Sequence, residues 1–107
     1  VVSDQYGKPT YAADLAAATQ KLVVGGYAPG VYHLVNEPAT TWYEFACAIF
    51  EEYKKLHPEF NMPMVKPCSS VEFPTVAHRP AYSVLLNTKF PPLREWREAL
   101  TGCLVEM

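Results

Sequence analysis

The sequence predicts an α/β protein with short, mostly parallel strands and about three helices. Apolar residues recur at helical spacing in three stretches of the chain. Between these stretches lie short runs rich in β-branched and aromatic residues, bounded by glycine, proline or asparagine. The resulting order, strand, helix, strand, helix, short strand, helix, favours parallel pairing. A chain of 107 residues has room for one modest core, so it forms a single domain.

The first strand is expected at residues 1–5, and it runs straight into a loop. The first helix is expected over residues 11–23, where apolar residues follow the helical period. Thr10 is in position to cap this helix, and Asp14 in its first turns suits the positive end of the helix dipole.

The middle of this helix is almost entirely alanine, which implies close packing against a sheet or another helix. Gly25 and Gly26 end the helix, because glycine adopts the left-handed cap conformation at little cost. The next β-branched and aromatic run, residues 31–35, is expected to be a strand.

The second helix has the clearest pattern. Thr41 and Glu44 form a capping box, in which each side chain bonds a backbone amide of the first turn. His57 and Pro58 end the helix. One face is apolar, which predicts core packing rather than a cofactor site. The members of this face are Trp42, Phe45, Ala46, Ile49, Phe50, Tyr53 and Leu56.

The rest of the chain is punctuated by proline. Residues 65–68 are expected to form a short edge strand. Thr88 is expected to cap a last helix that extends to about Leu104, with Pro91 and Pro92 in its first turn.

Composition excludes several classes of function. The formal charge is −2 and no basic stripe is present, so we expect no nucleic-acid partner. Apolar runs are shorter than a bilayer span, and no signal segment opens the chain, so we expect no membrane partner. The three cysteines are too widely spaced for a zinc site and odd in number, which favours reduced thiols in a cytoplasmic protein.

Two loops have the composition of a binding site. Residues 4–10 place Gln5 before a helix, at the end of a strand where open α/β sheets bind ligands. A plain turn with a helix cap explains this loop equally well. In residues 77–83, Arg79 precedes Pro80, and its guanidinium suits phosphate or carboxylate oxygens. An ion pair with a surface carboxylate is the alternative.

Several segments, in this order, resemble the dTDP-4-dehydrorhamnose reductases, which are extended short-chain dehydrogenases. The resemblance covers nearly the whole chain, and the motifs Asp-Gln-Tyr-Gly-x-Pro-Thr and Arg-Pro-x-x-Ser are its most particular parts. The similar segments are residues 2–10, 30–34, 41–46, 79–85 and 96–100.

The resemblance implies an oxidoreductase that passes hydride from NADPH to the C4 keto group of a dTDP-linked 6-deoxyhexulose. In this family a glycine-rich cofactor loop and a catalytic Tyr-x-x-x-Lys pair lie in the amino-terminal part. None of the seven tyrosines here is followed four residues later by lysine, and no dinucleotide fingerprint is present. We therefore expect residues 1–107 to be the carboxy-terminal, substrate-binding part of such an enzyme, without its cofactor-binding Rossmann half. This part is expected to contain no catalytic or cofactor-binding residue and to be inactive alone.

By analogy with the family, Gln5, Arg79 and Thr10 are the candidates for contacting the nucleotide-sugar substrate. Some members pair through Mg²⁺ held by acidic residues, and Asp14 is the candidate ligand, although its place in the helix dipole explains it equally well. A homo-oligomer, or self-association of the fragment, is expected.

Two alternatives remain open. The first is an epimerase or reductase of the same superfamily that acts on another nucleotide-sugar. The second is a non-catalytic nucleotide-sugar-binding or regulatory subunit, and the coding sequence upstream of Val1 distinguishes it from the reductase.

Overall fold

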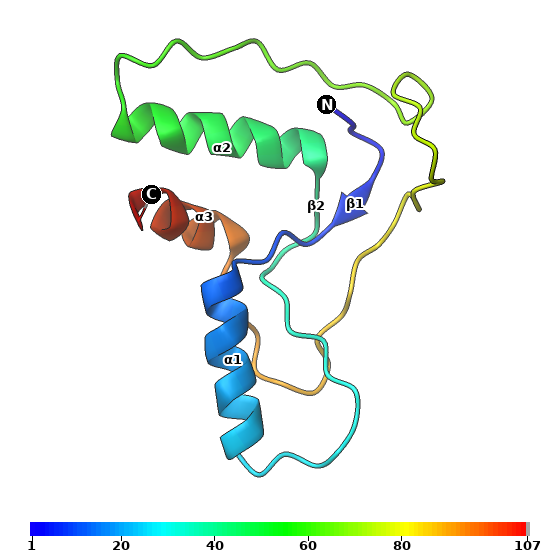
Figure 1. The fold of residues 1–107 in the computed structure, drawn as a ribbon, viewed down its shortest axis with the longest axis vertical. Coiled ribbons are helices and arrows are strands. Elements are labelled where there is room, and N and C mark those ends of the chain that lie inside the picture. Colours follow the sequence, from blue (N-terminus) through cyan, green and yellow to red (C-terminus); the bar gives the residue numbers. More distant parts are fainter. Residues whose placement is uncertain (107) are drawn as a thin grey trace.

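The structure is a computed structural model that describes residues 1–106. Helices α2 and α3 lie side by side, and helix α1 projects away from them (Figure 1). The short strands β1 and β2 meet beside the start of α2. In chain order the elements are β1 (Tyr6–Gly7), α1 (Ala12–Val24), β2 (Thr40–Thr41), α2 (Trp42–Leu56) and α3 (Trp96–Glu106). The three expected helices are therefore present.

The core lies between α2 and α3. Its buried centre is Ala48, Trp96 and Leu100, and Phe45 packs edge to face against Trp96 with ring centroids 5.5 Å apart. Two members of the predicted apolar face of α2, Phe45 and Ile49, thus pack against this core, whereas Ala48 at its centre was not assigned to that face. Trp42 and Leu56, at the two ends of the helix, depart from the prediction, because 54% and 43% of their surfaces are exposed.

The ends of α2 follow the sequence signals, with one difference. The Thr41 hydroxyl accepts a hydrogen bond from the Glu44 amide at 3.1 Å, and His57 is the carboxy-terminal cap. The Glu44 carboxylate, however, accepts from the hydroxyl of Thr40 at 2.7 Å, so half of the expected capping box is replaced by a side-chain bond.

The amino-terminal cap expected for α1 is wrong. Tyr11 occupies the cap position and forms no side-chain cap bond. The Thr10 hydroxyl is engaged elsewhere, because it donates to the Lys8 carbonyl at 3.1 Å and accepts from the Asn36 amide at 3.3 Å. At the other end the helix stops as predicted, with Gly26 in the left-handed region at φ 71°.

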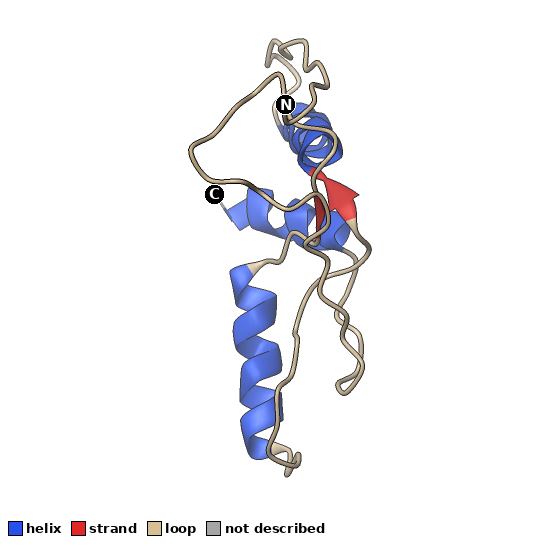
Figure 2. Ribbon diagram, turned by 90° about the vertical axis from the view of Figure 1, so that its right-hand side faces the viewer, coloured by secondary structure: helices blue, strands red, loops and turns tan. Residues whose placement is uncertain are grey.

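The alanines of α1 are mostly exposed, contrary to the close packing expected of them. Only Ala18 is buried, and it faces the segment that contains Phe90 and Leu93. α1 stands apart from the layer formed by the other helices (Figure 2), so no element of the described chain covers the rest of its alanine face.

The sheet also differs from the mostly parallel one expected. β1 and β2 are antiparallel, with Tyr6 opposite Thr41 and Gly7 opposite Thr40. Within residues 1–106, parallel pairing occurs only as isolated bridges. These are Val2 with Cys68, Tyr6 with Tyr82, and Glu37 with Glu95. The first strand is therefore displaced toward residues 6–7, and the edge strand expected at residues 65–68 is reduced to its last residue.

The strand expected at residues 31–35 is not formed. This segment makes no backbone hydrogen bond to any other residue in the described part of the chain. Its composition favours extended backbone, but a strand exists only where a neighbouring strand pairs with it.

The last helix begins at Trp96 instead of following Thr88. The Glu37 amide donates to the Arg94 carbonyl at 3.3 Å, and the Trp96 amide donates to the Glu37 carbonyl at 2.6 Å. These two bonds hold Glu95 in a bridge with Glu37, so the helix starts only at Trp96. No helix within residues 1–106 is long and apolar enough to cross a bilayer.

Candidate functional site

Strand β1 brings the two predicted binding loops together. The Tyr6 amide donates to the Ala81 carbonyl at 2.8 Å, and the Ser83 amide donates to the Tyr6 carbonyl at 2.9 Å. These bonds attach the segment that follows Arg79 to the residue that follows Gln5. The positions of the two candidate ligand-binding residues are therefore set by backbone pairing.

Asp4 and Gln5 hold a third segment in place. The Asp4 carboxylate accepts from the Ser70 amide at 2.9 Å and from the Ser70 hydroxyl at 2.7 Å. These two hydrogen bonds, chiefly the one from the Ser70 amide, lower the pKa of Asp4 below its usual value. The carboxylate is therefore ionised at neutral pH. The Gln5 side-chain nitrogen donates to the Ser70 hydroxyl at 3.2 Å, which fixes the orientation of its amide.

Gln5 and Arg79 line the same cavity, which has a volume of about 340 Å³. His78, from the same loop as Arg79, also lines it. Arg79 is exposed and forms no ion pair with any residue of the described chain. The surface ion pair considered as an alternative for Arg79 is thus not formed within residues 1–106, and its guanidinium is available to an anion.

A second cavity of about 220 Å³ adjoins Gln5 on the side of β1 and α2. Its walls include Lys8, Thr40, Trp42 and Ser83. The Lys8 ammonium lies 2.7 Å from the Glu37 carboxylate, and only 6% of the Lys8 side chain is exposed. The sequence analysis missed this cavity, because its walls come from three separated segments and no local motif links them.

Thr10 does not join Gln5 and Arg79. It lies on a separate cavity of about 160 Å³ whose other walls include Phe45, Trp96 and Leu100 of the core. Since its hydroxyl is already bonded to Lys8 and Asn36, the structure gives Thr10 a role in holding the loop. A contact between Thr10 and substrate stays a prediction.

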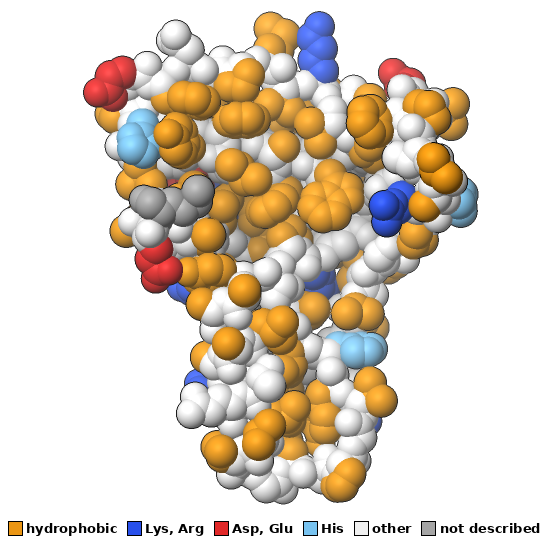
Figure 3. Space-filling model, in the orientation of Figure 1, with side chains coloured by type: hydrophobic (Ala, Val, Ile, Leu, Met, Phe, Trp, Pro, Cys, Tyr) orange, Lys and Arg blue, Asp and Glu red, His pale blue; other side chains and the backbone are white. Residues whose placement is uncertain are grey.

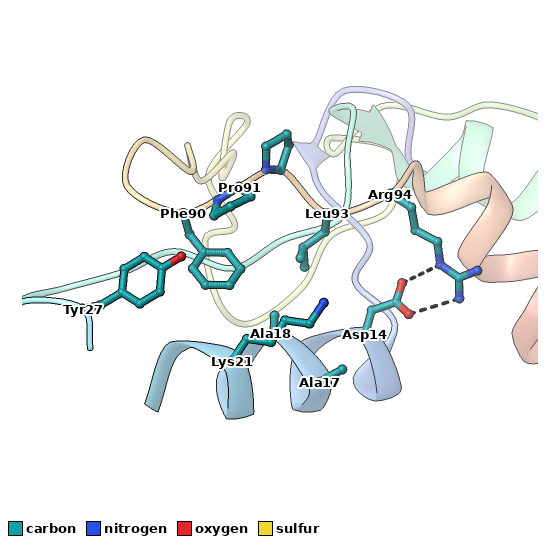
Figure 4. Close-up of a pocket in the computed structure, with 10 residues that line it drawn as sticks. Asp14, Ala17, Ala18, Lys21, Tyr27, Phe90, Pro91, Leu93 and Arg94 are labelled. Carbon is teal, nitrogen blue, oxygen red and sulfur yellow. Dashed lines mark hydrogen bonds and ion pairs between the residues drawn. The ribbon is translucent and has the colours of Figure 1, made fainter. Parts of the chain in front are cut away.

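Asp14 forms an ion pair with Arg94, and both residues line a further cavity of about 370 Å³ (Figure 4). Its two carboxylate oxygens accept from Arg94 Nε at 2.9 Å and from an Arg94 terminal nitrogen at 3.1 Å. The hydrogen bond from Arg94, assisted by one from Asn36, lowers the pKa of Asp14. Within residues 1–106 no group of three or more His, Cys, Asp or Glu side chains is arranged to hold a metal ion. The expected Mg²⁺ ligand role of Asp14 therefore gains no support.

Asn36 is a structural residue that the sequence analysis missed. It is completely buried, and its side chain accepts from the Tyr11 amide at 2.7 Å and donates to Asp14 at 3.0 Å and to the Arg94 carbonyl at 3.1 Å. It thereby joins the start of α1 to the segment before α3. Its place in an Asn-Glu-Pro turn was the only signal in the sequence, and that signal does not identify partners that are distant along the chain.

Comparison with known proteins matches this arrangement to one family. Residues 1–107 match the family described as RmlD substrate binding domain. The dTDP-4-dehydrorhamnose reductase of Aggregatibacter actinomycetemcomitans is 38% identical over 110 residues, covering 94% of this chain and 37% of that protein. The enzyme of the same name from Mycolicibacterium smegmatis is 41% identical over 105 residues, covering 94% of this chain and 31% of that protein.

The fold agrees with the sequence comparison. The crystal structure of dTDP-4-dehydrorhamnose reductase from Bacillus anthracis, in complex with NADP, superposes with a TM-score of 0.84 at 35% identity. All of this chain and 37% of that one are covered, so the chain spans about a third of the length of the proteins it matches. The α/β fold class is thereby confirmed, and the chain belongs to the RmlD substrate binding domain family.

Proposed function

We propose that this chain is the carboxy-terminal, substrate-binding part of a dTDP-4-dehydrorhamnose reductase. The whole enzyme reduces the C4 keto group of dTDP-4-dehydro-6-deoxy-L-mannose to give dTDP-L-rhamnose. The observation that carries the proposal is the shared cavity of Gln5 and Arg79, in a chain whose relatives have this name.

In this proposal the chain binds and orients the nucleotide-sugar. The Arg79 guanidinium donates two parallel N–H bonds to diphosphate oxygens, which is the pairing its planar fork favours. Gln5 lies across the same cavity, with its amide nitrogen held by Ser70 and its carbonyl oxygen available to a substrate hydroxyl.

Reduction needs groups that lie outside these 107 residues. We assign NADPH as the hydride donor because a relative of known structure is a complex with NADP. We assign its site and the catalytic Tyr-x-x-x-Lys pair to a Rossmann half of the same polypeptide. In this proposal the chain does not donate a proton to the keto oxygen; its role is to bind the substrate and hold it in position.

We also place the enzyme in the cytoplasm, as a homo-oligomer. The three free cysteines, Cys47, Cys68 and Cys103, are compatible with a reducing compartment. The proposal of a homo-oligomer is supported by the exposed apolar surface of α1 and of the segment after it.

A comparison of two proteins tests the proposal. The complete polypeptide that contains this chain is expected to oxidise NADPH in the presence of dTDP-4-dehydro-6-deoxy-L-mannose, followed as loss of absorbance of the reduced nicotinamide. The 107-residue chain alone is expected to give no turnover and no measurable binding of NADPH. Turnover by the isolated chain contradicts its assignment as a fragment, and a complete protein active only on another nucleotide-sugar contradicts the assigned substrate.

A further inference from the structure

Gln5 lies between two cavities that differ in charge. The cavity it shares with Arg79 contains a guanidinium that no carboxylate within residues 1–106 neutralises. Among the described residues that line the other cavity the only cation is Lys8, and Glu37 neutralises it at 2.7 Å. An anionic group is therefore attracted to the first cavity and a neutral group suits the second.

The second cavity is also the one with an aromatic wall. Trp42 is the first residue of α2, and its backbone position is set by the Thr41 cap just before it. Its ring packs beside Phe45 with centroids 6.3 Å apart, while 54% of the residue remains exposed. A large aromatic ring that is fixed by its helix and still exposed is suited to stacking against a ligand.

We propose that this second cavity holds the hexose ring of the nucleotide-sugar, and that Trp42 is the surface on which the ring stacks. This inference rests on the function proposed above and adds which residue recognises the sugar. A 6-deoxyhexose presents C–H groups and a methyl group on one face, and these are attracted to the negative face of an aromatic ring.

The remaining polar groups of the cavity fit a sugar. Within the described chain, the Gln5 side-chain oxygen and the Ser83 hydroxyl form no hydrogen bond, so both are available to sugar hydroxyls. The Thr40 hydroxyl is already donated to Glu44.

The base of the nucleotide is the competing occupant, because aromatic side chains also stack on bases. Two ligands separate the possibilities: dTDP, which lacks the hexose, and dTDP-L-rhamnose, which carries it. Titration calorimetry of the complete protein with each ligand is made for the wild type, Trp42→Ala and Trp42→Phe. Tyr27→Ala is the matched control, since Tyr27 is an exposed aromatic residue on the distant cavity of α1.

For Trp42→Ala we expect the Kd of dTDP-L-rhamnose to rise about tenfold and that of dTDP to change less than twofold. Trp42→Phe, which keeps an aromatic face, is expected to retain most of the affinity, and Tyr27→Ala to leave both constants unchanged. Equal losses for both ligands place the base on Trp42 and overturn the inference, as does an unchanged Kd for both.

Failure of the proposed function has a different signature. It appears in the wild type, as a preference for another nucleotide-sugar over dTDP-L-rhamnose. In that case the same comparison, made with the preferred nucleotide-sugar and its own nucleoside diphosphate, still decides whether Trp42 contacts the sugar.

Discussion

Arg79 is the single residue on which substrate affinity is expected to depend most. It is exposed, has no carboxylate partner within residues 1–106, and lines the cavity of Gln5. In the complete enzyme, Arg79→Ala should raise KM for the nucleotide-sugar about tenfold to a hundredfold. A hydrogen bond to a charged group is worth about 1.5–3 kcal/mol, which corresponds to that range. KM for NADPH should stay nearly constant.

Arg79→Lys is the matched variant for this prediction. Lysine keeps the charge and loses the planar fork, so an intermediate rise of KM is expected if the contact is bidentate. Steady-state kinetics with each substrate varied in turn measures both constants. If Arg79→Ala leaves KM for the nucleotide-sugar unchanged, Arg79 has a structural role instead.

Asp14 makes a pH-dependent contribution to stability. Its pKa is lowered in the folded chain, chiefly by Arg94. A lowered folded pKa gives stability that is present above the unfolded value, near 4, and is lost as pH falls through the folded pKa. Asp14→Asn should therefore unfold at lower urea concentration than the wild type at pH 7, and the difference should begin to shrink as pH falls below about 4.

Urea titrations between pH 3 and pH 7 measure this difference. Arg94→Gln, which removes the partner and leaves the carboxylate, should show the same pH dependence. A difference between Asp14→Asn and the wild type that persists unchanged at pH 3 means that the geometry of the carboxylate, and not its charge, stabilises the fold.

At the residue scale, local sequence predicted two residues of the candidate site, and it missed two residues that hold the surrounding structure. The composition of two loops predicts Gln5 and Arg79 as candidate ligand-binding residues, and in the structure both line one cavity. Asn36 and Lys8 were missed because their roles depend on partners 22 to 58 residues away along the chain. No pattern of neighbouring residues in the sequence indicates that an asparagine will be buried or that a lysine will be paired with a distant carboxylate.

At the scale of elements, helices were predictable and strands were not. The apolar face of α2 determines where it packs, since a helix satisfies its own backbone and needs only one covered face. Residues 31–35 have a strand composition, but their hydrogen-bond partners must come from another segment, and none in the described chain supplies them. For α3, long-range bonds from Glu37 moved the start beyond Thr88, which local sequence does not encode.

The amino-terminal cap of α2 should be measurable as a property of that helix. Thr41 is buried, and its hydroxyl accepts from the Glu44 amide. Thr41→Ala leaves that amide without its partner and should cost about 1 kcal/mol of unfolding free energy in urea titrations. Thr19→Ala is the matched control, because Thr19 is exposed inside α1 and should change stability by less than about 0.5 kcal/mol. Equal losses for the two variants contradict a capping role for Thr41.

At the scale of the whole molecule, the chain is more open than its length implies. Its radius of gyration is 16.2 Å, against about 13 Å for a compact domain of 100 residues. Its accessible surface is 7482 Å², whereas a folded protein of this mass exposes about 6,000 Å². The excess of about 1,500 Å² exceeds the roughly 800 Å² that each partner buries in a standard interface.

Much of the visible face is apolar (Figure 3), and the exposed apolar residues include Val23, Val24 and Val31. Residues 31–35, which begin at Val31, form no backbone hydrogen bond to another residue of the described chain. Exposed apolar surface next to an unpaired extended segment is a template for pairing with another chain. We therefore expect the isolated 107-residue chain to self-associate, through edge pairing or exchange of an element between copies.

Sedimentation across a range of protein concentrations tests this expectation. The average mass of the wild-type chain should rise with concentration, and Val31→Lys should reduce the rise, because a charge at an exposed edge opposes pairing. Asn61→Lys adds the same charge on the exposed loop after α2, away from α1 and residues 31–35, and should leave association unchanged. If the wild-type chain is strictly monomeric at the highest concentration, its copies do not associate despite the exposed edge. That result would favour an independent binding module over a part of a larger reductase.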